Sequence, residues 1–529
     1  MTRKDLPDFA AMEFDEKVQI LFDYIQQLEA EIKGLREENA RLKGLSPKPV
    51  LSPANPPEVV GDNQEKKKRG GSKPGTRRSK TRELEIHQTQ VIQPEGLIPE
   101  GFVFKGYQEY VVQDLKISAC NTLYKLARWE SPDGKSVMGV LPNTIDGHFG
   151  NPLRGYILYQ HNQCRVTEPL LLEQLHEFGI EISSGQLHAI LTQGHEIFHE
   201  EKQSILEAGL QMSPYVQVDD TGARHDGKNG FCTVICNPFF AYFETTYSKS
   251  RINFLNILRG LHQDYIITEE AIEYAKLHKL PLPQLQALGQ ERRFENTEEW
   301  ERFLRDNGIE QILHVRIATE AALIGSLMEH GFNPNLVILS DDAGQFNIFL
   351  HALCWIHAER LVKKLSPYTE EQVAAVAQLR AQIWDFYDCL KEYKNAPTEE
   401  AATKLDKVFD DIFQQQTCYT SLNALLKRLY KNKAELLLVL SRPEVPLHNN
   451  QSESDIREKV QRRKISVTFS SAGRKCRDTF SSLKKTCRKN GISFWEYLND
   501  RLADQWKTAP LSSVIRTHIQ AYTEPIVVT

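Results

Sequence analysis

Hydrophobic residues recur every seven positions near the N-terminus. The two repeated positions are occupied by Val18, Ile25, Ile32 and Asn39 and by Leu21, Leu28, Leu35 and Leu42. β-branched residues at the first position and Leu at the second favour a parallel two-stranded coiled coil, and a single Asn fixes its register. The pattern predicts a coiled-coil dimerisation helix over residues 14–45, with homodimer contact through residues 18–42. The alternative is one amphipathic helix packed on its own domain.

The heptad pattern is lost after residue 45. Five prolines fall between residues 46 and 57, and a basic run follows up to residue 82. Such a segment buries too little apolar surface to offset the entropy of ordering it, which predicts a disordered linker over residues 46–82. Alternation in FVFKGYQEYVVQDLKI and the turn sequence SPDGK then predict a small β-rich region over residues 83–140.

Residues 141–205 carry apolar residues at helical spacing. PLRGYILYQHNQ predicts one helix, and TEPLLLEQLHEFGIEISSGQLHAILTQGHE predicts two helices around a turn at Gly179, the second capped by Ser183 or Ser184. This is a helix-turn-helix outline. The region is either a DNA-contacting element or a structural helix pair, since both uses share the spacing.

Residues 206–500 combine strand and helix patterns. YVQVDDTGARH, FCTVICN and AYFETTYS predict three strands, INFLNILRGL a helix, and NLVILSDDAGQF a further buried strand. Helical sequence interrupts this order at about residues 265–330 and 367–445, and a tail covers residues 501–529. A three-strand meander followed by a helix, with an acid ending the first strand, predicts an α/β fold with a ribonuclease-H-like mixed-sheet core.

The composition is that of a multidomain globular protein. The chain has 529 residues, of which 40% are hydrophobic and 26% charged, which excludes a disulfide-stapled peptide, a collagen and wholesale disorder. No run approaches the ~18 apolar residues of a membrane span, and no signal peptide is recognisable, so a cytoplasmic protein without membrane contact is expected. The nine cysteines include no CxxC pair, so no zinc is expected.

Charge is unevenly distributed along the chain. Residues 65–82 hold nine basic residues against one acid, and residues 457–489 hold twelve against two. Subtracting both segments from the net charge of −5 leaves about −23 on the rest of the chain. Cationic segments on an acidic protein bind polyanions by counterion release, and nucleic acid is the expected partner. The alternative is a solvated linker and a solvated helix face.

Three acids stand where a metal site for phosphate chemistry needs them. Asp219 and Asp341 each follow an apolar strand, and Glu453 stands at a predicted helix start after the polar turn HNNQS. Mg²⁺ prefers carboxylate oxygens, and two such ions can drive in-line displacement at phosphorus. Each acid taken singly is more often a cap or turn residue. Their order on one fold outline, beside basic sequence, favours the metal site.

Several strings resemble one protein family. These are GHFGNPLRGYILYQ, VDDT, CWIHAER at 354–360, HNNQSE at 448–453 and the closing KNGISFWEYLNDRL. Together with the N-terminal heptads and basic linker, they resemble the large transposases of the insertion-sequence 66 family (TnpC type), members of the Asp-Asp-Glu group. The resemblance runs from about residue 14 to residue 505. It departs from the family in lacking a cysteine-rich element before the core and in the long interval between the first two acids.

The resemblance implies that Asp219, Asp341 and Glu453 are the catalytic acids and metal ligands, with Asp342 as the alternative to Asp341. Trp355 and His357 are candidates to border the site, although a buried Trp and a capped His are equally expected.

The implied function is a dimeric bacterial DNA transposase. It would bind Mg²⁺, which Mn²⁺ could replace, and would cleave DNA at element ends and transfer a strand to target DNA, alone or with helper proteins. Alternatives are an inactive or domesticated DNA-binding regulator and a nuclease of the same fold that joins nothing. The residues expected to contact DNA phosphates are Lys66, Lys67, Lys68, Arg69, Arg77, Arg78, Arg457, Arg462, Arg463 and Lys464.

Overall fold

A computed structural model describes residues 84–523, except 95, 97–100, 109, 143–146 and 290. The chain divides into two compact units, Met1–Asp114 and Leu115–Thr529. The predicted coiled coil over 14–45 and the linker over 46–82 lie outside the described residues. None of the described helices is long and apolar enough to cross a membrane.

The segment expected to be β-rich contains few strands. Its described residues have two, β1 (Arg128–Glu130) and β2 (Ser136–Met138), which pair antiparallel around the SPDGK turn. Their side chains are exposed on both faces, including Trp129. Alternation of apolar residues upstream of Arg128 therefore does not produce strands in the described part of 84–127, because no second layer buries one face.

In the described part of the chain, four helices precede the central sheet. They are α2 (Asn151–Asn162), α3 (Glu168–Glu177), α4 (Ser184–Thr192) and α5 (Glu196–Met212). The turn between α3 and α4 contains Gly179 at φ 77°, a left-handed conformation that glycine adopts without strain. Ser183 caps α4 in a reciprocal capping box with Gln186. The α3–α4 pair packs against α2, and α4 also contacts α17.

The central sheet has five strands in the order β5-β4-β3-β8-β9. The strands β3 (Tyr215–Gly222), β4 (Phe231–Cys236) and β5 (Ala241–Thr246) form an antiparallel meander. The strands β8 (Val337–Ser340) and β9 (Leu350–Leu353) add to it in parallel with β3. The result is a mixed sheet, as the α/β prediction requires.

The two faces of this sheet belong to different cores. Val216 and Val218 of β3 pack into the large core that includes α5 and α10 (Ile312–Glu329). Cys232 and Val234 of β4 pack on the opposite face with Ile456 of α16 (Asn450–Ile465). Successive residues of a strand point to opposite faces, so β3 presents alternate side chains to two separate helical layers.

Helix α17 (Ser471–Lys489) covers the open edge of β5. Its side chains Asp478, Ser482 and Thr486, spaced by four residues, accept hydrogen bonds from the backbone N–H groups of Thr245, Phe243 and Ala241 at 2.8, 2.9 and 3.2 Å. An uncovered edge strand would leave these donors unpaired and available to another chain. The polar sequence of α17 therefore serves the edge of the sheet.

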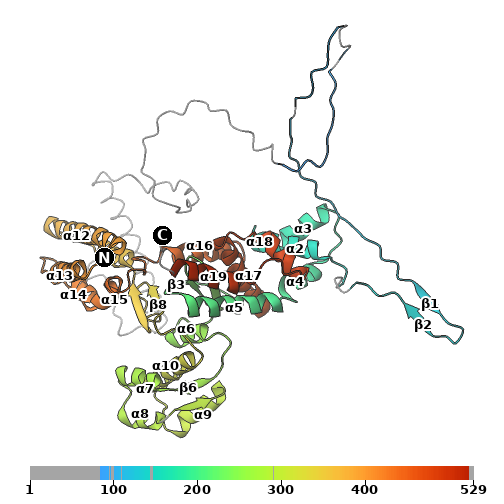
Figure 1. Cartoon of the computed structure of the whole chain (residues 1–529). Helices are drawn as coiled ribbons and strands as arrows, with labels where there is room; N and C mark the ends of the chain where they lie inside the picture. The colour runs from blue at the N-terminus through green and yellow to red at the C-terminus, as the bar shows by residue number, and fades with distance from the viewer. Residues whose placement is uncertain are drawn as a thin grey trace, which may run out of the picture. The chain divides into compact units, whose positions relative to one another are not determined.

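Two insertions extend from the sheet. The first follows α6 (Arg251–Leu258) and contains α7 (Glu269–Leu277), α8 (Leu282–Leu288) and α9 (Thr297–Asp306) beside α10, as Figure 1 shows. It also contains a short antiparallel pair, β6 (Tyr265–Ile267) with β7 (Arg292–Phe294), in a segment predicted to be mostly helical.

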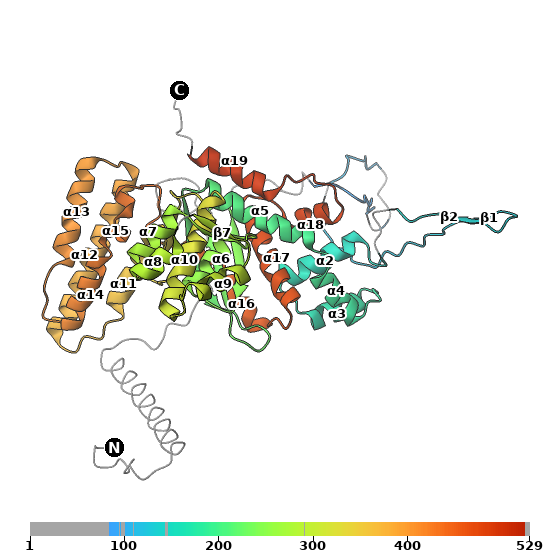
Figure 2. The same cartoon turned by 90° about the horizontal axis from the view of Figure 1, so that it is seen from below.

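The second insertion is a helical bundle with its own core (Figure 2). After α11 (Trp355–Lys363) it comprises α12 (Glu370–Asn395), α13 (Glu399–Phe413), α14 (Thr420–Lys431) and the short α15 (Lys433–Leu436). A 3₁₀ turn over 438–440 leads back to the sheet.

The C-terminal part closes the large core. The helices α18 (Phe494–Leu502) and α19 (Leu511–Thr523) pack on α2 and α5 respectively. Arg501 of α18 is fully buried and donates to both carboxylate oxygens of Glu201 on α5, at 2.9 and 3.0 Å. This two-pronged ion pair neutralises both charges inside the core.

Candidate active site

The strand pairing brings Asp219 and Asp341 to the same place. β3 and β8 run parallel with Tyr215 opposite Val337 and Gln217 opposite Leu339. Continuing this register by two residues sets Asp341, the first residue after β8, beside Asp219, which lies within β3. Neighbouring strands lie about 4.8 Å apart, and paired residues of parallel strands face the same side. Two carboxylates therefore converge at one edge of the sheet.

Gln217 links this edge to the start of α16. Its side-chain oxygen accepts hydrogen bonds from the backbone N–H groups of Gln451 and Ser452, at 3.1 and 3.4 Å. Gln217 lies two residues before Asp219 and therefore faces the same side of β3. Since Gln217 holds the first turn of α16 against that side, Glu453 in that turn comes to the same face as Asp219.

The electrostatics show that these acids lie within range of one another. Burial raises the pKa of Asp219 to about 7. A hydrogen bond from the Asp220 backbone N–H to Asp219 Oδ1, at 2.8 Å, acts in the opposite direction and lowers this pKa. The negative charges of Asp341, Asp220 and Glu453 raise the same pKa further. Repulsion of this kind is typical of carboxylates that share a site without enough cations to balance them.

Glu453 has a cationic partner from α11. Arg360 Nη1 donates to Glu453 Oε1 at 2.8 Å, and this contact is the leading cause of the raised pKa of Arg360. His357 Nε2 lies 3.3 Å from the same oxygen and 3.2 Å from Arg360 Nη1. Burial lowers the pKa of His357, so the imidazole is neutral at pH 7 and Arg360 alone balances the charge of Glu453.

The neighbouring acids point elsewhere. Asp342 forms an ion pair with Arg428 of α14, and Asp220 accepts from Gln345 at 2.6 Å. Asp455 is buried and pairs with Lys489 at 2.7 Å. Side chains alternate along β3, so Asp220 faces away from Asp219, and the β3–β8 register puts Asp341, and not Asp342, beside Asp219.

Trp355 lies away from the acids. Its ring is buried in the core of the α11–α15 bundle against Phe386 and Phe409, and its Nε1 donates to the carbonyl of Leu436 at 3.0 Å. The expectation that Trp355 borders the site is wrong, because its side chain anchors α11 in that bundle. His357, two residues further along the chain, is the residue of this pair that contacts an acid.

The expected DNA-contacting residues fall into three groups. Those of the linker, Lys66 to Arg78, lie outside the described residues. Arg457 and Lys464 are exposed on α16, and Arg463 is exposed with its guanidinium hydrogen-bonded to Thr221 Oγ1 at 3.0 Å. Arg462 is buried and donates to Asn162 Oδ1 at 3.2 Å, so it does not lie on the exposed surface of α16 where it was expected.

The donor chemistry fits a hard divalent cation. Carboxylate oxygens are the ligands that Mg²⁺ and Mn²⁺ take, and no described Lys or Arg forms an ion pair with Asp219 or Asp341. Within the described residues, no three His, Cys, Asp or Glu side chains are grouped closely enough to hold a metal ion together. Glu453, drawn to Arg360, is the acid that would have to turn toward the other two.

Sequence reasoning overlooks two residues of this site. Gln217 carries no recognisable signal, because an isolated Gln in a strand has many uses. Arg360 could have been found, since it follows His357 by three residues in CWIHAER and residues at that spacing share a helix face.

A mixed-sheet α/β domain that gathers acids at strand ends is consistent with a transposase-type, DNA-processing enzyme. Residues 329–475 match the family described as "Transposase IS66 family". The chain is also 45% identical over 318 residues to the uncharacterized protein y4jO of Sinorhizobium fredii (strain NBRC 101917 / NGR234). The aligned region covers 59% of this chain and 99% of that protein. The chain belongs to the IS66 transposase family, which confirms the resemblance seen in its motifs.

Proposed function

We propose that this chain is an Asp-Asp-Glu transposase that cleaves DNA at the ends of an insertion sequence and joins the freed 3′-hydroxyl to target DNA. The observation that carries the proposal is the convergence of Asp219 and Asp341 through the β3–β8 register, with Glu453 held over the same face. The strand order β5-β4-β3-β8-β9, antiparallel then parallel, supports a ribonuclease-H-like core. Family membership supports DNA as the substrate.

The three acids have distinct tasks in this proposal. Asp219 and Asp341 would hold divalent cations from two neighbouring strands, and Glu453 would complete the set from α16. When bound, the ions supply Lewis-acid activation of the attacking oxygen and stabilisation of the leaving oxygen. Burial raises the pKa of Asp219 to about 7, which disfavours the ionised form that a divalent cation would need.

Arg360 sets the resting state of the site. While it holds Glu453, the third acid is balanced within the protein and turned from the other two. Productive binding of DNA and metal then requires exchange of this ion pair for one in which Arg360 faces a phosphate. A homodimer through residues 18–42 would bring two element ends together and would have two such sites.

The test uses the native flanking DNA. A plasmid carries the gene, its flanking sequence and a selectable marker, and new junctions are sequenced from cells that express wild type, Asp219→Asn or Asp220→Asn. Wild type and Asp220→Asn should give junctions, because Asp220 faces Gln345. Asp219→Asn should give none. Equal junction counts from wild type and Asp219→Asn would contradict the assignment of the first acid, and DNA binding without any junctions would favour the regulator alternative.

A further inference from the structure

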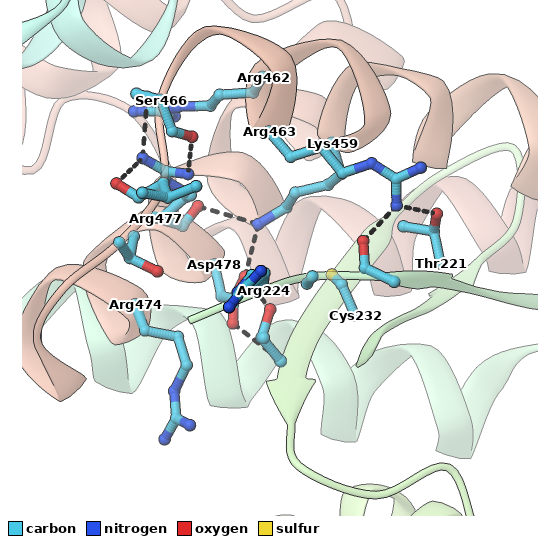
Figure 3. A pocket seen from close by; sticks show the side chains of 15 residues that line it. Thr221, Arg224, Cys232, Lys459, Arg462, Arg463, Ser466, Arg474, Arg477 and Asp478 are labelled. Carbon is cyan, nitrogen blue, oxygen red and sulfur yellow. Dashed lines mark hydrogen bonds and ion pairs between the residues drawn. The ribbon is translucent and has the colours of Figure 1, made fainter. Parts of the chain in front are cut away.

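A second charged site lies two residues further along β3 and near the C-terminal end of α16. A cavity of about 30 Å³ opens where β3 ends at Thr221 and Gly222, where α16 ends, and where α17 begins (Figure 3). Three sequence segments meet there, 221–224, 459–468 and 474–478. The volume accommodates about two water-sized groups, enough for the oxygens of a tetrahedral anion to enter from one side.

The lining of this pocket is strongly cationic. It contains one carboxylate, Asp478, and six basic side chains, Arg224, Lys459, Arg462, Arg463, Arg474 and Arg477. Asp478 is already committed: it accepts from Lys459 at 2.5 Å and from the backbone N–H and hydroxyl of Thr245 at 2.8 and 3.0 Å. Five cations therefore remain without a carboxylate partner among the pocket-lining residues.

Arg462 is the clearest case of a positive charge in this pocket that no acid balances. Its side chain is 4% exposed, and among the described residues no carboxylate lies within ion-pair distance of it. Its Nη1 donates to Asn162, while its buried Nη2 has no hydrogen-bond partner. Burial, and then the charge of Arg477, lower the pKa of Arg462 to about 9. A buried, unpaired guanidinium is costly unless an anion joins it.

The other arginines are held in place by neutral groups. Arg477 donates to the carbonyl and hydroxyl of Ser466 at 3.0 and 3.1 Å, and the guanidinium of Arg474 lies over the ring of Tyr247 at 5.2 Å. Arg463 is fixed on Thr221 and the carbonyl of Gly222. Neutral partners orient a guanidinium and leave its charge available, as in sites that bind oxyanions.

We propose that this pocket, which we call the Arg462 pocket, binds a phosphate, and that in the DNA complex the phosphate belongs to the DNA backbone. This source of the phosphate rests on the proposed function. Nine residues of α16 separate Glu453 from Arg462, a rise of roughly 13 Å, so the pocket lies within a few nucleotides of the acids. Arg224 and Arg463 are exposed at its rim, where a DNA strand has access.

The experiment compares the loss of one basic side chain that lines the pocket, Arg462, with the loss of one that does not, Lys464. Full-length wild type, Arg462→Met and Lys464→Met are melted with increasing inorganic phosphate at constant ionic strength, and their affinities for duplex flanking DNA are measured. Lys464 is exposed and does not line the pocket, so its variant controls for loss of one charge. Phosphate should raise the melting temperature of wild type and Lys464→Met by about 2 °C or more, and not that of Arg462→Met.

DNA affinity gives the second readout. Arg462→Met should bind DNA about tenfold more weakly than Lys464→Met, the loss expected for one charge-assisted hydrogen bond. If Arg462→Met loses phosphate protection yet binds DNA as Lys464→Met does, the pocket takes a free oxyanion and the DNA source is overturned. If phosphate protects no variant and both bind DNA alike, the pocket is not an anion site.

Two further variants keep these outcomes interpretable. Arg474→Gln, on the pocket wall and without an acid partner there, should also weaken protection, and it serves if Arg462→Met does not fold. Asp219→Asn should keep both phosphate protection and DNA affinity. Loss of junctions in that variant with binding intact separates a failure of the catalytic proposal from a failure of the pocket.

Discussion

The two ends of α16 lie beside groups of opposite charge. At its start, Glu453 comes to the face that holds Asp219 and Asp341, and burial, with repulsion from the neighbouring acids, raises the pKa of Asp219. At its end, Arg462 lies buried among other cations without an acid. Both ends rest on one strand, β3, which contributes Asp219 at one place and Thr221 and Gly222 at the other. One scaffold therefore presents a site for cations and a site for phosphate at a fixed separation.

Elsewhere the protein balances its buried charges. Arg501 is paired with both oxygens of Glu201, and Lys202 pairs with Glu244 at 2.5 Å. The contrast sets these paired charges of the core against the two places where a polyanionic substrate and its metal ions would bind. The same kind of substitution should therefore have different effects on activity and stability at these places and in the core.

The largest effect is expected at the acid end. Asp341→Asn should lower strand cleavage of flanking DNA by at least about a thousandfold, because several kcal/mol of charge stabilisation are lost. Asp342→Asn is the matched control and should retain most activity, since Asp342 pairs with Arg428. Cleavage is measured with purified protein, Mg²⁺ and labelled DNA. Inactivity of Asp342→Asn with full activity of Asp341→Asn would transfer the role to Asp342.

The next effect compares two buried arginines. Arg501→Met leaves Glu201 buried and unpaired, and should lower the free energy of unfolding by about 3–5 kcal/mol. Arg462→Met removes a charge that has no acid partner, and without phosphate it should leave that free energy unchanged or raise it. Urea unfolding in phosphate-free buffer measures both. A loss of stability in Arg462→Met as large as that in Arg501→Met would show that Arg462 is balanced within the protein.

A smaller effect concerns acid stability. Burial, and then the charge of Arg462, lower the pKa of His161 to about 3, while its Nδ1 lies 2.9 Å from the carbonyl of Val166. The unfolded chain binds this proton near pH 6.5 and the folded chain does not, so stability falls as pH drops from about 6.5 toward 3, by at most about 1.4 kcal/mol per pH unit. His161→Gln should lose less stability between pH 7 and 5 than wild type, and equal losses would contradict a neutral buried His161.

The smallest effect is expected on the surface of α16. Arg457→Gln should weaken binding to specific and unrelated DNA by the same small factor, about two- to threefold, because an exposed Arg near phosphates reads no bases. Gel-shift titrations with two unrelated duplexes test this. A change in sequence preference at unchanged average affinity would assign Arg457 to base contact instead.

Much of the sheet and its acids could be predicted from the sequence. Strands that end in acids are visible as apolar runs followed by VDDT and SDDA, and the structure has β3 and β8 at those places. Asp341 was preferred with Asp342 as the alternative, because the choice depends on the pairing register of two strands 122 residues apart, Tyr215 with Val337. That register appears only when the sheet is assembled.

The errors have physical causes as well. Trp355 stands inside a family motif, yet its large aromatic ring packs in the core of the bundle. Arg462 looked like a surface residue because the buried side of α16 is formed by Asp455, Ile456, Lys459 and Arg462, a stripe that hydropathy does not reveal. Buried polar stripes of this kind are recognised from their partners, which the sequence alone does not identify.

The most direct test of the central claim is Mn²⁺ binding by the full-length protein, followed by electron paramagnetic resonance. If Asp219, Asp341 and Glu453 form one metal site, wild type binds Mn²⁺, each of Asp219→Asn, Asp341→Asn and Glu453→Gln weakens binding at least about tenfold, and Asp342→Asn does not. Unchanged Mn²⁺ binding in all three acid variants would contradict the shared site.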